Sequence, residues 1–175
     1  MARAINTDFY QAFRFAVSLD DVAGQYLEAQ AGFNNVTIPE ISTEASEYRD
    51  GQTIWTKKYP GPPTVSDSTL QQGVAAIGAG VAKGNPFFNW MMAAIEGRRY
   101  RSDITIWHIH LGDGFPPADI VNPASSRAIT LYECFPIRVK PDGDLDATSG
   151  EVSLREIDVA CERIEVSSVE PGSTP

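Results

Sequence analysis

The sequence predicts a mainly β domain, a barrel or sandwich of six or seven strands with one amphipathic helix packed against it. Short segments in which apolar and polar residues alternate recur along the chain, and Gly, Pro, Asp and Asn separate them. Only one segment has its apolar residues at helical spacing. No repeat of fixed period occurs, which argues against a solenoid or a propeller.

The first strands are predicted in the N-terminal third of the chain. Apolar residues alternate in FRFAVSL, residues 13–19, which predicts a half-buried strand. A second strand is predicted at residues 26–33, and residues 34–51 form a third whose pattern is interrupted by Pro39. A proline within a strand pattern indicates a bulge or a position at the edge of a sheet.

The middle of the chain combines a connection, a strand and the helix. Residues 53–63, TIWTKKYPGPP, are expected to form an irregular connection with a proline-rich end, and residues 64–74 a further strand. The helix is predicted to begin at Pro86, after a possible cap at Asn85, and to end at Gly97.

Three strands are predicted in the C-terminal half. They cover residues 102–111, 127–139 and 151–166, and a turn-rich acidic loop precedes the last of them. In that last strand the apolar residues change parity, which predicts either a bulge near Arg155–Glu156 or different burial of the two halves of the strand.

Length, charge and composition limit the class of protein. The 175 residues suggest one domain, expected to span residues 1–166 and to be followed by a flexible tail at 167–175. A net charge of −9 argues against nucleic-acid binding, which needs clustered cations. The N-terminus has no signal-peptide pattern, and the longest weakly polar stretch, residues 73–81, is too short to cross a bilayer. We therefore expect synthesis in a cytoplasm and no membrane anchor.

The strongest catalytic signal is the pair His108 and His110. Alternating residues of a strand point to the same side, so both imidazoles could reach one metal ion, with Asp103, Asp113 or Glu133 as a third ligand. These are the only two histidines, and a pair of polar strand positions is the more common arrangement. We predict no catalytic residue, no metal and no cofactor, and keep a β-barrel metal-binding enzyme as an alternative.

Other metal and redox patterns are incomplete. Cys134 and Cys161 lie in apolar strand settings without zinc or redox spacing, so we expect small buried hydrophobic residues, and whether they form a disulfide is left open. Asp142, Asp144 and Asp146 have the spacing of a calcium loop but lack its glycine and closing glutamate, which favours a solvated turn.

The order of several segments carries a family resemblance. The pieces are FRFAVSL, AGFNNVTIPEIS, EYRDG followed by KKYPG and TLQQGV, FFNWMMAAIEG, and FPIRV followed by DLDATSGEVSLREIDVACERIEV. Together they resemble the tail tube proteins of contractile phages and the inner-tube proteins of extracellular contractile injection systems, and more distantly the secreted ring protein of type VI secretion. The resemblance covers residues 10–166, but GVAAIGAGVAKGNP and LGDGFPPADIVNPASS depart from the family pattern.

The resemblance implies a structural role without catalysis. It implies a tail-tube fold, six copies in a ring, and rings that stack into a hollow tube inside a contractile sheath, with strands of all six subunits forming one lumen wall. Baseplate proteins, terminator or cap proteins, and a DNA or protein cargo would be partners of a particle made in a bacterial host cytoplasm. A baseplate-proximal tube initiator of the same family is the alternative, and phage tail and bacterial injection system both remain open.

The resemblance also suggests which residues contact other subunits. The connection from Tyr48 to Gly61 would reach the neighbouring ring, with aromatic residues as buried anchors and cations paired to acidic residues. The alternative is that this connection folds back on its own domain. The predicted contacts are Tyr48, Arg49, Trp55, Lys57, Lys58 and Tyr59.

The residues that line the bore are expected on the long strands. An acidic bore would repel a nucleic-acid or acidic cargo, so that the cargo slides. The predicted lumen residues are Glu44, Ser46, Ser153 and Arg155.

Overall fold

The protein is described by a computed structural model. It describes residues 9–19, 33–51, 54–74, 86–110, 127–145, 148, 150 and 152–168. These residues form a seven-stranded antiparallel sheet, a separate two-stranded ribbon and one helix. The predicted mainly β class is confirmed, in a sandwich-like form rather than a closed barrel.

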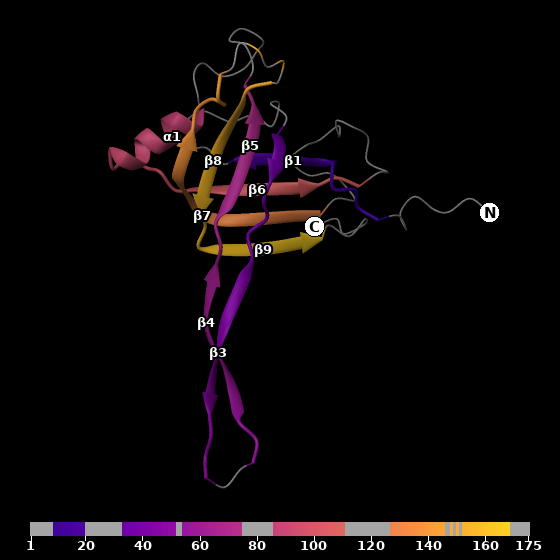
Figure 1. Ribbon diagram of the computed structural model, residues 1–175, viewed down its shortest axis with the longest axis vertical. Helices are drawn as coiled ribbons and strands as arrows, with labels where there is room; N and C mark the ends of the chain where they lie inside the picture. The colour runs from indigo at the N-terminus through magenta and orange to yellow at the C-terminus, as the bar shows by residue number, and fades with distance from the viewer. Residues whose placement is uncertain are drawn as a thin grey trace, which may run out of the picture.

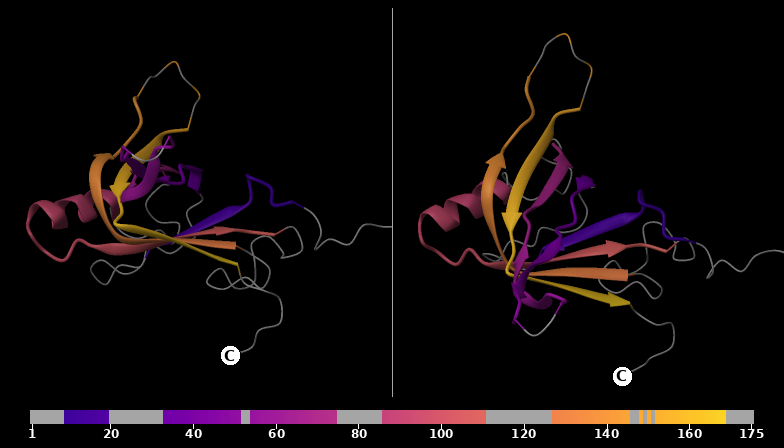
Figure 2. Two further views of the ribbon diagram at one scale, coloured as in Figure 1. Left: turned by 90° about the horizontal axis from the view of Figure 1, so that it is seen from below. Right: turned by 60° about the horizontal axis from the view of Figure 1, so that its bottom comes forward.

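One long strand, β7, joins two layers of the sheet. Its first half pairs with β6 and β9, and its second half pairs with β8. Glu133 has a φ of 53°, the left-handed conformation, near the point where the partners change. Figures 1 and 2 show the strands of the two layers crossing at a steep angle.

The first layer has the order β1-β6-β7-β9, and the second layer has the order β7-β8-β5-β2. Every pairing in both layers is antiparallel. The strands are β1 (Phe15–Leu19), β2 (Phe33–Val36), β5 (Ser68–Gly73), β6 (Ser102–His108), β7 (Arg127–Lys140), β8 (Leu154–Ala160) and β9 (Arg163–Ser168).

The hydrophobic core lies between the layers and under the helix α1 (Pro86–Ile95). Alternation along each strand directs one set of side chains inward, as Ile104 and Ile106 show on β6. On α1, Phe87 and Trp90 are buried, and the indole N–H of Trp90 donates to the carbonyl of Tyr100. The helix packs beside β7, which closes one side of the core.

Several predicted boundaries are confirmed. The helix begins at Pro86, and Gly97 follows its end with a φ of 69°, a conformation that glycine adopts without strain. Pro39 lies between β2 and the next strand, where the interruption was predicted. The strand predicted at 26–33 lies outside the described residues except for Phe33. Of the tail predicted at 167–175, the first two residues belong to β9, and residues 169–175 lie outside the described residues.

The irregular connection predicted at residues 53–63 is wrong from Lys57 onward. Here the chain forms β4 (Lys57–Val65), a strand that contains three prolines and pairs with β3 (Ile41–Tyr48). A strand with a neighbour on one side only leaves alternate N–H groups without a ladder partner, so it tolerates residues that lack the N–H. The local composition therefore gave the wrong element.

The bulge predicted near Arg155–Glu156 is also wrong. Pairing of β8 with β5 runs without interruption through both residues. Strand β8 ends instead at Ala160, where the chain leaves the second layer and then forms β9 in the first layer. Parity seemed to change because Val152 is exposed outside the strand, whereas a charged residue, Arg155, occupies an inward position.

Arg155, predicted to line a lumen, points into the interior of its own chain. Its side chain is 6% exposed, its Nε donates to Oε1 of Gln72 at 2.8 Å, and its guanidinium lies 5.2 Å from the centre of the Phe87 ring. Burial lowers the pKa of Arg155, while the charge of Asp142 opposes this shift. Arg155 therefore supports the contact between the second layer and α1.

The two cysteines are buried and free, as small hydrophobic residues of the core. Burial raises the pKa of the Cys134 thiol to about 12 and also raises that of Cys161. Both groups are therefore protonated thiols at neutral pH.

Candidate functional site

The ribbon of β3 and β4 projects away from both layers of the sheet (Figure 1). All eight residues of β3 are exposed, and so are seven of the nine residues of β4. An isolated two-stranded ribbon is only marginally stable in water, because neither face packs on anything. The predicted alternative, in which this segment folds back on its own domain, is therefore wrong.

Weak interactions hold the ribbon together. Lys58 pairs with Glu47 across the strands at 3.3 Å, and Lys57 pairs with Asp50 at 3.5 Å, but exposed ion pairs contribute little to stability. The register also shifts between Thr43 and Ala45. This leaves the ribbon dependent on a surface that covers it.

Gly61 allows the close approach of the two strands at this register shift. A Cβ atom at Gly61 would lie 2.6 Å from the backbone oxygen of Glu44, so any larger residue would displace one strand. The predicted lumen residue Glu44 thus lies at an irregularity of the ribbon.

The tip of the ribbon exposes large apolar side chains. Trp55 is 83% exposed and Ile54 is 84% exposed. Tyr48 and Tyr59 follow on the strands behind the tip and are also exposed. Such a group of aromatic and aliphatic side chains on a projecting element is typical of a protein–protein contact. Ile54 was missed in the sequence, although its position beside Trp55 was a signal.

The structure brings all six predicted contact residues onto the ribbon. Lys57 is in register with Tyr48, and Tyr59 is in register with Ser46. Arg49 is exposed and forms no ion pair within the described part of the chain. The far half of the ribbon therefore presents aromatic rings together with an uncompensated cation.

The four predicted lumen residues do not gather on one surface. Glu44 and Ser46 lie on β3 of the ribbon, beside the contact residues. Ser153 lies before β8, where its hydroxyl accepts a hydrogen bond from the backbone N–H of Gly143 at 3.0 Å. Arg155 is buried. Strand parity read from the sequence could not group these residues, because they belong to three different parts of the fold.

The two histidines lie beside Tyr10, at the end of β6. The Tyr10 ring centroid is 5.1 Å from that of His108 and 5.5 Å from that of His110. Nε2 of His108 lies 3.1 Å from the carbonyl oxygen of Gln11. Among the described residues no group of three or more His, Cys, Asp or Glu side chains is arranged to hold a metal ion.

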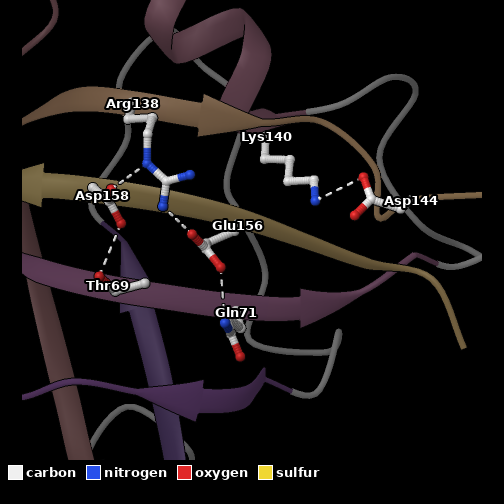
Figure 3. A network of polar contacts seen from close by, with 7 residues as sticks. All are labelled: Thr69, Gln71, Arg138, Lys140, Asp144, Glu156 and Asp158. Carbon is white, nitrogen blue, oxygen red and sulfur yellow. Dashed lines mark hydrogen bonds and ion pairs between the residues drawn. The ribbon is translucent and has the colours of Figure 1, made fainter.

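The outward face of the second layer carries a network of charges that pair with one another (Figure 3). Nε of Arg138 donates to Asp158 at 2.5 Å, and another guanidinium nitrogen donates to Glu156. Gln71 donates to Glu156 and Thr69 to Asp158, each at 2.8 Å. The face is therefore polar and largely neutralised within one chain.

We expect this network to make stability depend on pH. Hydrogen bonds from Gln71 and Arg138 lower the pKa of Glu156. Burial raises the pKa of Asp158, but hydrogen bonds from Arg138 and Thr69 outweigh this effect. Both pKa values therefore lie below the usual ones. The network's contribution is thus complete above the usual carboxyl pKa of about 4 and is lost as pH falls through the lowered values.

Denaturant unfolding between pH 7 and pH 2.5 measures this dependence. The Arg138→Met variant should lose less stability on acidification than the unmodified protein, because its carboxylates are less stabilised in the folded state. Equal pH dependence in both proteins would contradict the assignment.

The outward face of the first layer combines small residues with larger ones, among them Trp107, Tyr132 and Arg163. One row across the four strands is formed, in register, by Ser18, Thr105, Thr130 and Glu165. Strands β1 and β9 form the two ends of this layer, and each has a single strand partner within the described chain. Unpaired edges of this kind are templates for pairing with another chain.

No helix in the described ranges is long and apolar enough to span a membrane.

Comparison with known proteins gives the family and the fold. The sequence matches the family described as T4-like virus tail tube protein gp19 over residues 11–165. No curated protein sequence gives a significant match.

Three solved structures are similar over nearly the whole chain. The PVC sheath-tube complex of an extracellular contractile injection system in the extended state has a component with 23% identity and a TM-score of 0.71, covering 94% of this chain and 96% of that chain. A component of the PVC sheath/tube terminator in the extended state has 23% identity and a TM-score of 0.68, and the match covers 93% of this chain and 99% of that chain. A component of the anti-feeding prophage baseplate has 16% identity and a TM-score of 0.67, and the match covers 94% of this chain and 99% of that chain. At these identities the likeness establishes a shared fold.

Proposed function

Because this chain belongs to the family of T4-like virus tail tube proteins, we propose that six copies close into a ring and that rings stack into the hollow inner tube of a contractile phage tail or injection particle. Family membership makes the chain a structural tube subunit and not an enzyme. A sheath around the tube, and baseplate and cap proteins at its ends, are the partners that the similar structures suggest. DNA or a protein would pass through the bore.

The observation that carries this proposal is the exposed ribbon. A strand with every residue exposed, paired only to one other strand, has little to stabilise it in an isolated chain. Contact with another copy would bury the aromatic residues at its tip and order the ribbon. The ribbon would thus link one ring to the next.

The edges of the first layer support ring closure. The layer has four antiparallel strands, so its two ends, β1 and β9, run in opposite directions. If β9 of one copy pairs with β1 of the next, strand direction continues to alternate through every copy. A heterologous contact of this kind closes into a ring when its rotation divides the circle.

This closure would place the outward face of the first layer toward the bore. The other face of the first layer packs on the second layer and, through the core, on the helix. The bulk of each chain fits on the convex side of a ring, where there is more space. The row of Ser18, Thr105, Thr130 and Glu165 would then line the lumen, in place of the four residues predicted from the sequence.

Electron microscopy of the purified protein, with light scattering for mass, tests the proposal. We expect rings with a central hole, six chains in mass, and short stacks at higher concentration. Hydrogen exchange should then show new protection of alternate amides on β1 and β9 in rings compared with dissociated chains. A homogeneous monomer at every concentration, also in the presence of sheath and baseplate proteins, would contradict the tube function.

A further inference from the structure

The ribbon and the connection between β7 and β8 lie at opposite ends of the molecule. In Figure 1 the ribbon points down the long axis, and the β7–β8 connection stands at the other end. The register explains this placement: Ser68, at the ribbon end of β5, pairs with Val159, whereas Gly73, at its other end, pairs with Leu154. About 20 Å of strand separates the two ends.

The described part of this connection, residues 141–145 with Val152 and Ser153, is here called the hairpin end. It exposes two large apolar side chains, Leu145 at 88% and Val152 at 72%. Both residues belong to the single connection between β7 and β8, and their exposed aliphatic side chains are candidates for burial against another protein. The hairpin end thus resembles the ribbon tip with its exposed Ile54 and Trp55, because both expose large apolar side chains that contact with another chain would bury.

The charges of the two ends are complementary. Among the described residues, the ribbon between 47 and 58 carries three cations and two anions, whereas the hairpin end together with Lys140 carries one cation and two anions. Ion pairs within the chain use Lys57 and Lys58 on the ribbon and Asp144 at the hairpin end. Exposed Arg49 and exposed Asp142 form no ion pair within the described ranges.

We propose that the hairpin end is the acceptor for the ribbon tip of a second copy in the adjacent ring, with Trp55 and Ile54 against Leu145 and Val152, and Arg49 near Asp142. This inference rests on the proposed function, because it names the surface that receives the ribbon. The occupant is a second copy since both halves of the contact, apolar and charged, occur once on each chain at opposite ends. Such a head-to-tail contact repeats without limit along an axis.

The geometry of the ribbon is sufficient for this contact. Its longer strand, β4, has nine residues and extends about 30 Å from the layers. A ribbon of that length can contact a copy stacked on the ribbon end of the molecule. The acceptor also gives stacking a direction, because two ribbons or two hairpin ends present like surfaces to each other.

Crosslinking tests the contact directly. A mixture of Thr56→Cys and Asp144→Cys chains is allowed to stack and is treated with a short bismaleimide. Both positions are exposed neighbours of Trp55 and Leu145, which stay unchanged. We expect a crosslinked dimer in stacks and none in isolated rings; the native thiols, Cys134 and Cys161, are buried. The matched control replaces Asp144→Cys by Phe88→Cys, which places the thiol on α1 at a partly exposed position.

A charge inserted at the acceptor gives an independent readout. Leu145→Asp should leave folding and ring formation unchanged, because the side chain is exposed, but should raise the concentration needed for stacking at least tenfold. Phe88→Asp is the control and should stack normally. Stacks without the Thr56–Asp144 crosslink, or normal stacking of Leu145→Asp, would overturn the acceptor while leaving the tube function intact. Failure of the unmodified protein to form rings would overturn both.

Discussion

Trp55→Ala is expected to abolish the stacking of rings and to leave the folded chain unchanged. The indole is 83% exposed at the ribbon tip, so its removal takes no contact from the core and should change the free energy of unfolding by no more than about 0.5 kcal/mol. At an interface, truncation of a central aromatic residue costs about 2 kcal/mol or more. Every copy in a ring repeats this loss, so stacks should be absent at concentrations at which the unmodified protein forms them.

Sedimentation velocity and electron microscopy measure stacking, and thermal unfolding measures the fold. Trp55→Phe is the matched variant, because it retains an aromatic ring, and it should preserve most of the stacking. If Trp55→Ala unfolds the chain, the indole packs on the core and the ribbon is not a projecting element. If the variant stacks normally, other residues of the ribbon carry the contact between rings.

Phe87→Ala is expected to have the largest effect on stability, a loss of about 3–5 kcal/mol in the free energy of unfolding. The Phe87 side chain is fully buried, contacts Phe33 at 6.2 Å between ring centroids, and lies under the guanidinium of Arg155. Truncation would leave a cavity between α1 and the second layer. It would also remove the aromatic ring against which the buried guanidinium of Arg155 packs.

Phe88→Ala is the control for this prediction, at the neighbouring position of the same helix. Its side chain is 47% exposed, so we expect a loss of about 1 kcal/mol or less in denaturant unfolding. Equal losses in both variants would show that α1 does not pack with Phe87 inward. A smaller effect of Phe87→Ala in a background that already carries Arg155→Met would show that the two side chains stabilise each other.

Most elements could be predicted from local patterns in the sequence. Alternation identified β1, β6 and β7, and the Pro86 and Gly97 signals placed both ends of the helix. The six predicted contact residues all occur within residues 48–59, and the structure places this stretch on one ribbon. Their contact with other copies stays a prediction. These features depend on residues that are close in the sequence.

The errors arose where a residue's role depends on a distant part of the chain. Three prolines within residues 57–65 indicated an irregular segment, but the strand forms because its other edge has no neighbour. Arg155 was predicted to be a surface residue, but its side chain contacts Gln72 and Phe87 in the interior. Neither environment can be recognised from the residues on either side.

The sequence by itself therefore determined the β class, the helix and the family resemblance, because periodicity, caps and turns act over a few residues. Only the tertiary structure decided which surfaces those residues form. It placed the ribbon and the hairpin end at opposite ends of the sheet, left β1 and β9 as its edges, and buried Arg155. The physical reason is that strand order, register and burial arise from contacts between segments far apart in the chain, and assembly depends on where those contacts leave surface uncovered.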